Sequence, residues 1–175
     1  MQAAWSGKTI DYIQQHVQKS LPQIPNIILL HAGTNDMSAN ASIAKQGDDP
    51  QMAIDRLAML IDNITIAVPD AVMLVAKIIP TNQTGWESSF DQELRTVAYQ
   101  NLIPGVVAVR AQQGRRILCV DFSNFPMSAI NPGGVHLTDA GYQLMGRWWY
   151  DFIHQIPAEW INTPAGANPQ RVSCK

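Results

Sequence analysis

Apolar positions in the first third of the chain follow two different spacings. One stripe at helical spacing predicts a helix from Thr9 to Leu21, closed by the prolines that follow. The stripe consists of Ile10, Ile13, Val17 and Leu21. The next run, IILLHAG at 27–33, is continuously apolar and ends in glycine, which is typical of a strand covered on both faces.

The same alternation continues through the rest of the chain. Helical spacing predicts a helix from Gln51 to Ala67, a longer one from Phe90 to Gln113 interrupted at Pro104-Gly105, and a last one from Ala140 to Gln155. Two further apolar runs, AVMLVAKII at 71–79 and RILCVDF at 116–122, predict strands between these helices.

Alternating helices and buried strands predict an α/β fold of the flavodoxin-like, doubly wound kind. Right-handed crossovers would give three layers, α/β/α, around a parallel sheet. Sites in such sheets form beyond the carboxyl ends of the strands. We therefore expect the loops at 31–37, 80–86 and 123–136 to share one edge of the sheet.

Composition narrows the class of protein. With 46% hydrophobic and 15% charged residues, the 175-residue chain has enough apolar material for one domain, predicted at 1–158, with a tail at 159–175. A formal net charge of -2 and scattered basic residues argue against a nucleic-acid partner. No apolar run reaches the roughly 18 residues of a membrane span, and the first residues lack the features of a signal peptide.

Two short motifs place polar groups where sites form. HAGTNDM, at 31–37, follows the first apolar run, and its Asn35 and Asp36 are either turn residues or, for Asn35, a donor to a developing oxyanion. WSGKT, at 5–9, precedes the first helix. Its Gly7 is either a turn glycine behind a Ser6 helix cap or a backbone N–H that approaches a substrate oxygen.

Histidine supplies the candidate base. His136 lies in GGVHLTDAGY, between a glycine turn and the last helix, for which Thr138 is the expected N-cap. This position puts it at the same predicted sheet edge as Asn35. His31 lies inside an apolar run and is predicted to be a core histidine.

The remaining candidate residues are those that could bind a sugar, a metal ion or a cofactor. Trp86, in a predicted site-edge loop with Asn82, is a candidate for stacking against a sugar ring. No set of His, Cys and carboxylate residues has metal-ligand spacing, and no glycine-rich phosphate loop is present, so we expect neither a metal nor a cofactor.

Taken together, WSGKTID, ILLHAGTNDM and GGVHLTDAGY resemble the SGNH hydrolases, or GDSL-type esterases, and most of all the acetylxylan esterases of carbohydrate esterase family 3. The resemblance runs from about Trp5 to about Phe152. It implies a serine nucleophile that attacks an ester, with His136 as general base and with Gly7 and Asn35 as oxyanion donors. The substrate it implies is a small or polysaccharide ester, and relatives of this kind are exported.

The sequence departs from the family pattern at two places. The family's nucleophile follows a first strand upstream of the Gly7 motif, and we expect both the strand and the serine to be absent from this chain. Family members also carry an aspartate three residues before the histidine, where this sequence has Gly133. Asp121 and Asp139 are possible replacements, although neither matches the motif.

Two hypotheses follow. In the first, the chain is most of an SGNH ester hydrolase for acetylated sugars, inactive as given because its serine is absent. In the second, it is a degenerate domain that binds carbohydrate or a partner without catalysis. In either case, loss of the first strand would leave the strand at 27–33 on the edge of the sheet, where it would promote self-association.

Overall fold

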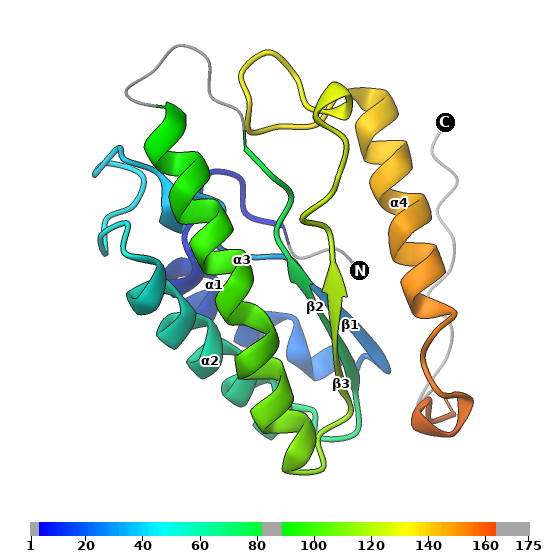
Figure 1. Cartoon of the computed structure of the whole chain (residues 1–175). Helices are drawn as coiled ribbons and strands as arrows, with labels where there is room; N and C mark the ends of the chain where they lie inside the picture. The colour runs from blue at the N-terminus through cyan, green and yellow to red at the C-terminus, as the bar shows by residue number, and fades with distance from the viewer. Residues whose placement is uncertain (1–3, 82–88, 164–175) are drawn as a thin grey trace.

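The computed structural model describes residues 4–81 and 89–163, without the side chains of residues 89 and 90. Within these ranges, three parallel strands form one sheet in the order β1-β2-β3 (Figure 1). The strands are β1 (Ile27–Leu30), β2 (Val72–Lys77) and β3 (Ile117–Asp121). The α-helices are α1 (Ile10–His16), α2 (Pro50–Ala67), α3 (Ser89–Gln112) and α4 (Asp139–Ile153). The short 3₁₀ turns are Val17–Lys19, Leu21–Gln23, Asn35–Met37, Met127–Ala129 and Ala158–Trp160.

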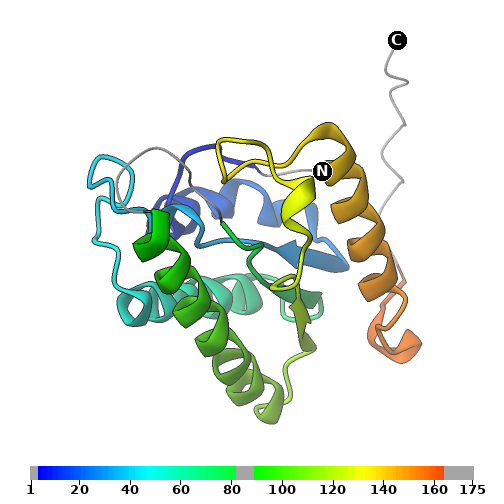
Figure 2. The same cartoon turned by 45° about the horizontal axis from the view of Figure 1, so that its top comes forward.

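The sheet lies between two helical layers, as Figures 1 and 2 show. Helices α1, α2 and α3 cover one face, where Met73 and Val75 of β2 belong to the larger apolar core. Helix α4 covers the other face, where Val72 and Leu74 of β2 belong to the second core. Alternate residues of one strand thus face opposite layers, and the predicted three-layer α/β/α fold is confirmed.

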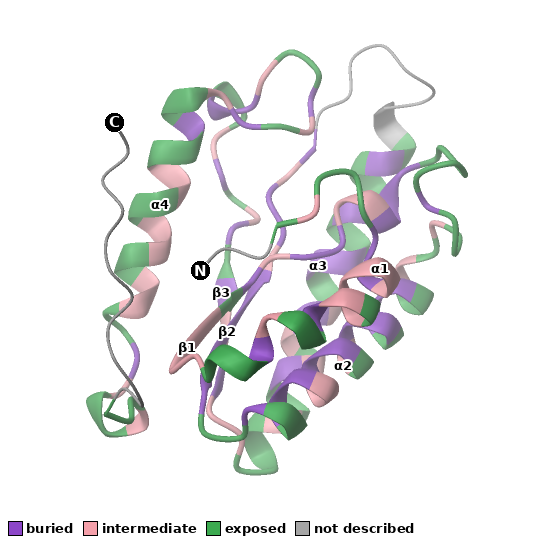
Figure 3. Ribbon diagram, turned by 180° about the vertical axis from the view of Figure 1, so that it is seen from behind, coloured by how far each residue is buried: buried purple, intermediate pink, exposed green. Residues whose placement is uncertain are grey.

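Strand β1 is an edge strand of the described sheet. It pairs only with β2, whereas every residue of β2 from Val72 to Ala76 is buried between its two neighbours (Figure 3). Leu29 of β1 is 41% exposed on the side of the sheet that α4 covers. The predicted edge position of this strand is therefore confirmed within the described residues. The prediction that both of its faces are covered is wrong, because Leu29 is exposed on one of them.

Two helix predictions also need correction. The first helix ends at His16 rather than at residue 21, and the following residues form 3₁₀ turns. The expected break at Pro104 is absent, and α3 runs through it. A proline inside a helix costs one backbone hydrogen bond. Burial of Ile103 and Val107 on either side of Pro104 keeps the helix continuous.

Candidate functional site

The carboxyl ends of the three strands meet around His31. Its Nε2 accepts a hydrogen bond from the backbone N–H of Ile79, just after β2, at 3.2 Å. Its ring lies edge-on to Phe122, the residue after β3, with 6.2 Å between ring centroids. Removal from water lowers the pKa of His31 to about 4. His31 is thus a neutral structural histidine, as predicted, and it joins all three strand ends.

The Gly7 motif forms an exposed turn just before α1. Gly7 has a φ of +70°, which favours glycine, and the Lys8 N–H closes the turn on the Trp5 carbonyl at 3.3 Å. A Cβ added to Gly7 would have no atom within 4 Å, so this side of the backbone is open. The predicted Ser6 cap is wrong: Thr9 holds the N-cap position of α1.

A hydrogen bond joins the Asn35 side chain to the Gly7 turn. Asn35 Nδ2 donates to the backbone carbonyl of Lys8 at 2.9 Å, across 27 residues of sequence. An amide NH₂ carries two hydrogens, so one remains for a further acceptor. The structure therefore brings together the two motifs that carry the predicted oxyanion donors.

Beneath Asn35 lies a buried ion pair that the sequence did not indicate. Asp36 is fully buried, and its Oδ1 accepts from Nε and Nη2 of Arg56 at 3.1 and 2.9 Å. Its Oδ2 accepts from the backbone N–H of Ile10 at 3.0 Å. Desolvation raises the pKa of Asp36, although the bonds from Ile10 and Arg56 oppose that shift. One carboxylate thus ties the Asn35 loop to the start of α1.

Tyr99 of α3 supports the same loop from the other side. Its hydroxyl donates to the Ala32 carbonyl at 3.0 Å. A Cβ on Gly33, which has a φ of +121°, would lie 2.4 Å from the Tyr99 ring. Only glycine fits here, because both the backbone angle and the ring exclude a side chain.

His136 lies at the end of a short hairpin ahead of α4. Ile130 and Leu137 form an antiparallel bridge, and the Asn131 N–H donates to the His136 carbonyl at 2.8 Å. Thr138 caps α4 by accepting from the Gly141 N–H at 3.0 Å, as predicted. The His136 residue itself is exposed.

Within the described part of the chain, the His136 side chain makes no hydrogen bond or ion pair with a carboxylate, with Gly7 or with Asn35. Asp121 is engaged elsewhere: it accepts from Lys77 Nζ at 2.9 Å and from the Ser123 N–H at 2.8 Å. Burial raises the pKa of Asp121, but these bonds outweigh it and the pKa lies below its usual value. Asp139 lies in the first turn of α4.

The remaining predicted positions add little to this site. Trp86 and Asn82 lie outside the described residues. Trp148 and Trp149 of α4 pack on Phe122, with centroids 5.6 and 4.8 Å away. Over residues 4–81 and 89–163, no group of three His, Cys or carboxylate residues could hold a metal ion, and no helix is long and apolar enough to span a membrane.

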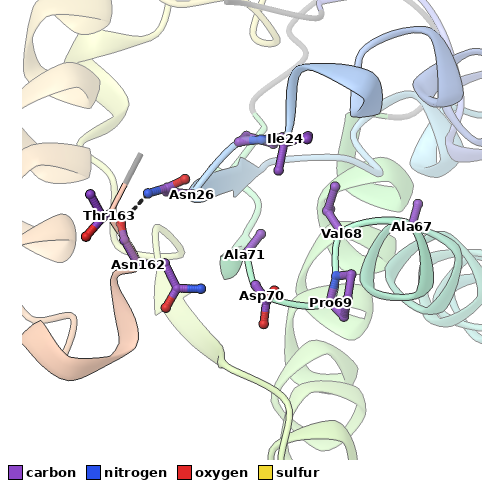
Figure 4. Close-up of a pocket in the computed structure, with 10 residues that line it drawn as sticks. Ile24, Asn26, Ala67, Val68, Pro69, Asp70, Ala71, Asn162 and Thr163 are labelled. Atoms are coloured by element: carbon purple, nitrogen blue, oxygen red, sulfur yellow. Dashed lines mark hydrogen bonds between the residues drawn. The ribbon is translucent and has the colours of Figure 1, made fainter. Parts of the chain in front are cut away.

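A shallow pocket of about 230 Å³ lies at the opposite end of the sheet (Figure 4). It is lined by residues that precede β1 and β2, among them Asn26 and Asp70, and by Asn162 near the end of the described chain. Asn26 donates to the Asn162 carbonyl, and Arg116 Nη1 donates to Asn162 Oδ1 at 3.0 Å. Arg116 Nη1 also donates to the Trp160 carbonyl at 2.9 Å, so residues 160–162 lie against the sheet. The domain boundary that we predict after residue 158 stays a prediction. The pocket belongs to the amino ends of the strands, away from Asn35.

The comparisons with known proteins agree with this fold. The GDSL-like Lipase/Acylhydrolase family matches residues 1–144. The structure is similar to a carbohydrate esterase family 3 protein from Talaromyces cellulolyticus, with a TM-score of 0.68, 21% identity and coverage of 86% of this chain and 68% of that one. It is also similar to a Clostridium thermocellum family 3 carbohydrate esterase, with a TM-score of 0.62, 26% identity and coverage of 86% and 67%.

One curated relative also matches. It is named "Putative endoglucanase X" from Acetivibrio thermocellus and is 26% identical over 135 residues. That match covers 75% of this chain, and the chain spans about half of the relative's length, 51%.

The three-layer α/β/α fold and the family match together define a member of an acylhydrolase family. The chain belongs to the GDSL-like Lipase/Acylhydrolase family. Its predicted resemblance to carbohydrate esterases is confirmed by the solved Clostridium thermocellum structure, which is 26% identical to it.

Proposed function

We propose that this chain forms the base and oxyanion side of an SGNH ester-hydrolase centre that acts on acetylated carbohydrate. The observation that carries the proposal is the Asn35–Lys8 hydrogen bond, which holds the Asn35 amide beside the Gly7 turn. Two N–H donors from different segments, aimed at one oxygen, are what a tetrahedral ester intermediate requires. The carbohydrate esterases and acetylxylan esterases among the similar structures support an acetyl ester of a polysaccharide as substrate.

In this mechanism a serine hydroxyl attacks the ester carbonyl and His136 takes its proton. The negative charge that develops on the carbonyl oxygen is stabilised by the Gly7 N–H and the Asn35 amide. His136 then returns the proton to the leaving alcohol, and water repeats the sequence on the acyl-enzyme. Trp86 and Asn82 remain proposed substrate contacts.

We expect the nucleophile to be neither Ser6 nor Ser38. Ser6 lies in the exposed turn at residues 5–8, and Ser38 is buried with its Oγ accepting from the Asn40 N–H at 3.2 Å. Neither is held in a strained strand-to-helix turn, the usual setting for a nucleophile of this kind. We therefore expect the chain as given to hydrolyse esters at a rate near background.

One observation favours a second candidate, a carbohydrate- or partner-binding domain without catalysis. Gly133 takes the place of the expected acidic residue, and in the described chain no carboxylate contacts His136. Loss of the orienting aspartate lowers the rate of a serine hydrolase by orders of magnitude. A domain selected only for binding would tolerate that loss.

A titration with sugars separates the two candidates. The ¹⁵N-labelled chain is mixed with acetylated xylo-oligosaccharides and, separately, with the same oligosaccharides after deacetylation. An ester-hydrolase centre predicts shifts of the Gly7 amide and the Asn35 side-chain amide with the acetylated sugar alone, and their loss in Asn35→Ala. Equal shifts with both sugars support the binding domain, and no shift at either group contradicts the hydrolase proposal.

We further propose that the chain self-associates through β1. The partner that we propose is a second copy of the chain. Among the described residues no strand pairs with the outer edge of β1, and Leu29 of this strand is 41% exposed.

A further inference from the structure

Asn131 and His136 stand directly opposite each other in the hairpin that precedes α4. The bridge between Ile130 and Leu137 is flanked by two backbone hydrogen bonds, Asn131 N–H to His136 carbonyl at 2.8 Å and Thr138 N–H to Ala129 carbonyl at 2.9 Å. In an antiparallel pair, residues opposite each other point to the same face, with Cβ atoms about 5 Å apart. The side chains of Asn131 and His136 therefore share the face opposite to the buried Ile130 and Leu137.

The Asn131 side chain holds an acceptor without a donor. Its Oδ1 is buried and has no hydrogen-bond partner in the structure. A buried carbonyl oxygen that has lost its water and gained no donor is unfavourable, and such atoms in folded proteins call for a functional explanation. On the shared face of the hairpin, the imidazole of His136 carries a ring N–H, which is a donor of the kind that this oxygen lacks.

The position of Asn131 Oδ1 provides a second observation about this pair of residues. It lies 3.2 Å from where a Cβ on Gly133 would be. Residue 133 is three positions before His136, the place of the acidic residue in the family that the motifs resemble. The Asn131 amide thus presents an acceptor oxygen in the space that a side chain at residue 133 would enter.

We propose that Asn131 is the positioning residue for His136, accepting a hydrogen bond from Nδ1–H through Oδ1. This bond selects the tautomer whose Nε2 carries the lone pair, which is the form a general base needs. Because an amide is neutral, it orients the ring without offsetting the charge of an imidazolium as a carboxylate would. The role in catalysis rests on the proposed function, whereas the contact itself does not.

The contact is tested by measuring the tautomer of His136, which does not depend on activity. The chain is labelled with ¹⁵N-histidine, and the two-bond ¹H–¹⁵N couplings are recorded at a pH where the imidazole is neutral. We expect the Nδ1–H form to predominate in the unmodified chain and the ratio of Nδ1–H to Nε2–H to fall about fivefold in Asn131→Ala, as befits one hydrogen bond. The matched control is Asn124→Ala, at an exposed asparagine of the same loop, which should leave the ratio unchanged.

A second variant distinguishes positioning from a general effect on the hairpin. Gly133 lacks a left-handed φ, so it accepts a side chain once Asn131 is shortened. The double variant Asn131→Ala, Gly133→Asp should restore the Nδ1–H form, with amide spectra showing that each variant is folded. A predominant Nε2–H form in the unmodified chain, or a ratio that Asn131→Ala leaves unchanged, would overturn the proposal. These results are independent of the sugar titration, so failure of either proposal is recognised separately.

Discussion

Asp36 and Arg56 form a buried ion pair in which one carboxylate oxygen, Oδ1, accepts from both Nε and Nη2 of the guanidinium, at 3.1 and 2.9 Å. The other oxygen binds the backbone of Ile10. The pair thereby couples helix α2, the loop of Asn35 and the start of α1. A buried ion pair adds little net stability, because both charges lose their water, but removing one partner is costly because the other is left buried and unpaired.

Arg56→Met should therefore be strongly destabilising. It preserves most of the side-chain volume but leaves the Asp36 carboxylate with only the Ile10 N–H, at an expected cost of about 3–5 kcal/mol in the free energy of unfolding. Lys77→Met is the control. It breaks the more exposed pair with Asp121, which should cost less than about 1 kcal/mol. Urea unfolding of both variants tests this, and equal losses would mean that the buried pair contributes no more than an exposed one.

The example of Asp36 indicates where sequence reasoning succeeds and where it fails. Helix α2 and strands β2 and β3 were predicted close to their observed bounds, because apolar spacing reports directly on which face of an element is buried. For Asp36 the sequence predicts only a turn residue. Its partner Arg56 is 20 positions away, on the buried side of a helix, and no local pattern identifies such a pair.

Some residues of the candidate site could likewise be predicted from the sequence, and others could not. Gly7, Asn35 and His136 could be selected because each lies in a motif with a recognisable turn or helix start. The edge position of β1 agrees with the prediction from the motif order. The exposure of Leu29 could not be predicted from the apolar run, since four consecutive apolar residues look alike in a central and an edge strand. No sequence pattern indicates Asn131, because its relation to His136 arises from hairpin pairing rather than from sequence spacing.

Stability should fall on mild acidification because of His31. Its pKa is lowered from 6.5 to about 4 in the folded chain, so the unfolded chain binds the proton first as the pH falls. The stability contributed by neutral His31 is therefore complete above pH 6.5 and is lost progressively toward pH 4. Between pH 7 and pH 5 we expect a loss of about 2 kcal/mol.

The matched variant for this test is His31→Gln, which keeps an acceptor for the Ile79 N–H but does not titrate. Urea unfolding at both pH values should show a smaller loss for the variant than for the unmodified chain. If both lose the same amount, another group is responsible for the pH dependence.

Leu29→Lys should reduce self-association through β1. A lysine at an edge strand opposes pairing with a second chain, and Leu29 is already 41% exposed, so the fold should lose little stability. Sedimentation velocity over a range of concentrations measures the effect. We expect the unmodified chain to associate as concentration rises and Leu29→Lys to remain monomeric. A monomeric unmodified chain at every concentration would refute the proposed association.

A serine-directed fluorophosphonate should form no covalent adduct with the chain. Such reagents label a serine only when a neighbouring base activates its hydroxyl and an oxyanion hole accepts the phosphoryl oxygen. The oxyanion hole would come from Gly7 and Asn35 and the base would be His136, but neither Ser6 nor Ser38 lies in a setting that would activate its hydroxyl.

In other serine hydrolases, loss of a triad member leaves a rate only about 10³ to 10⁴ times the uncatalysed one. Hydrolysis of an aryl acetate should accordingly be weak, and intact-mass spectrometry should show the unmodified mass. An adduct on a serine of this chain that His136→Ala abolishes, together with rapid turnover, would mean that the nucleophile is present and that the chain is a working esterase.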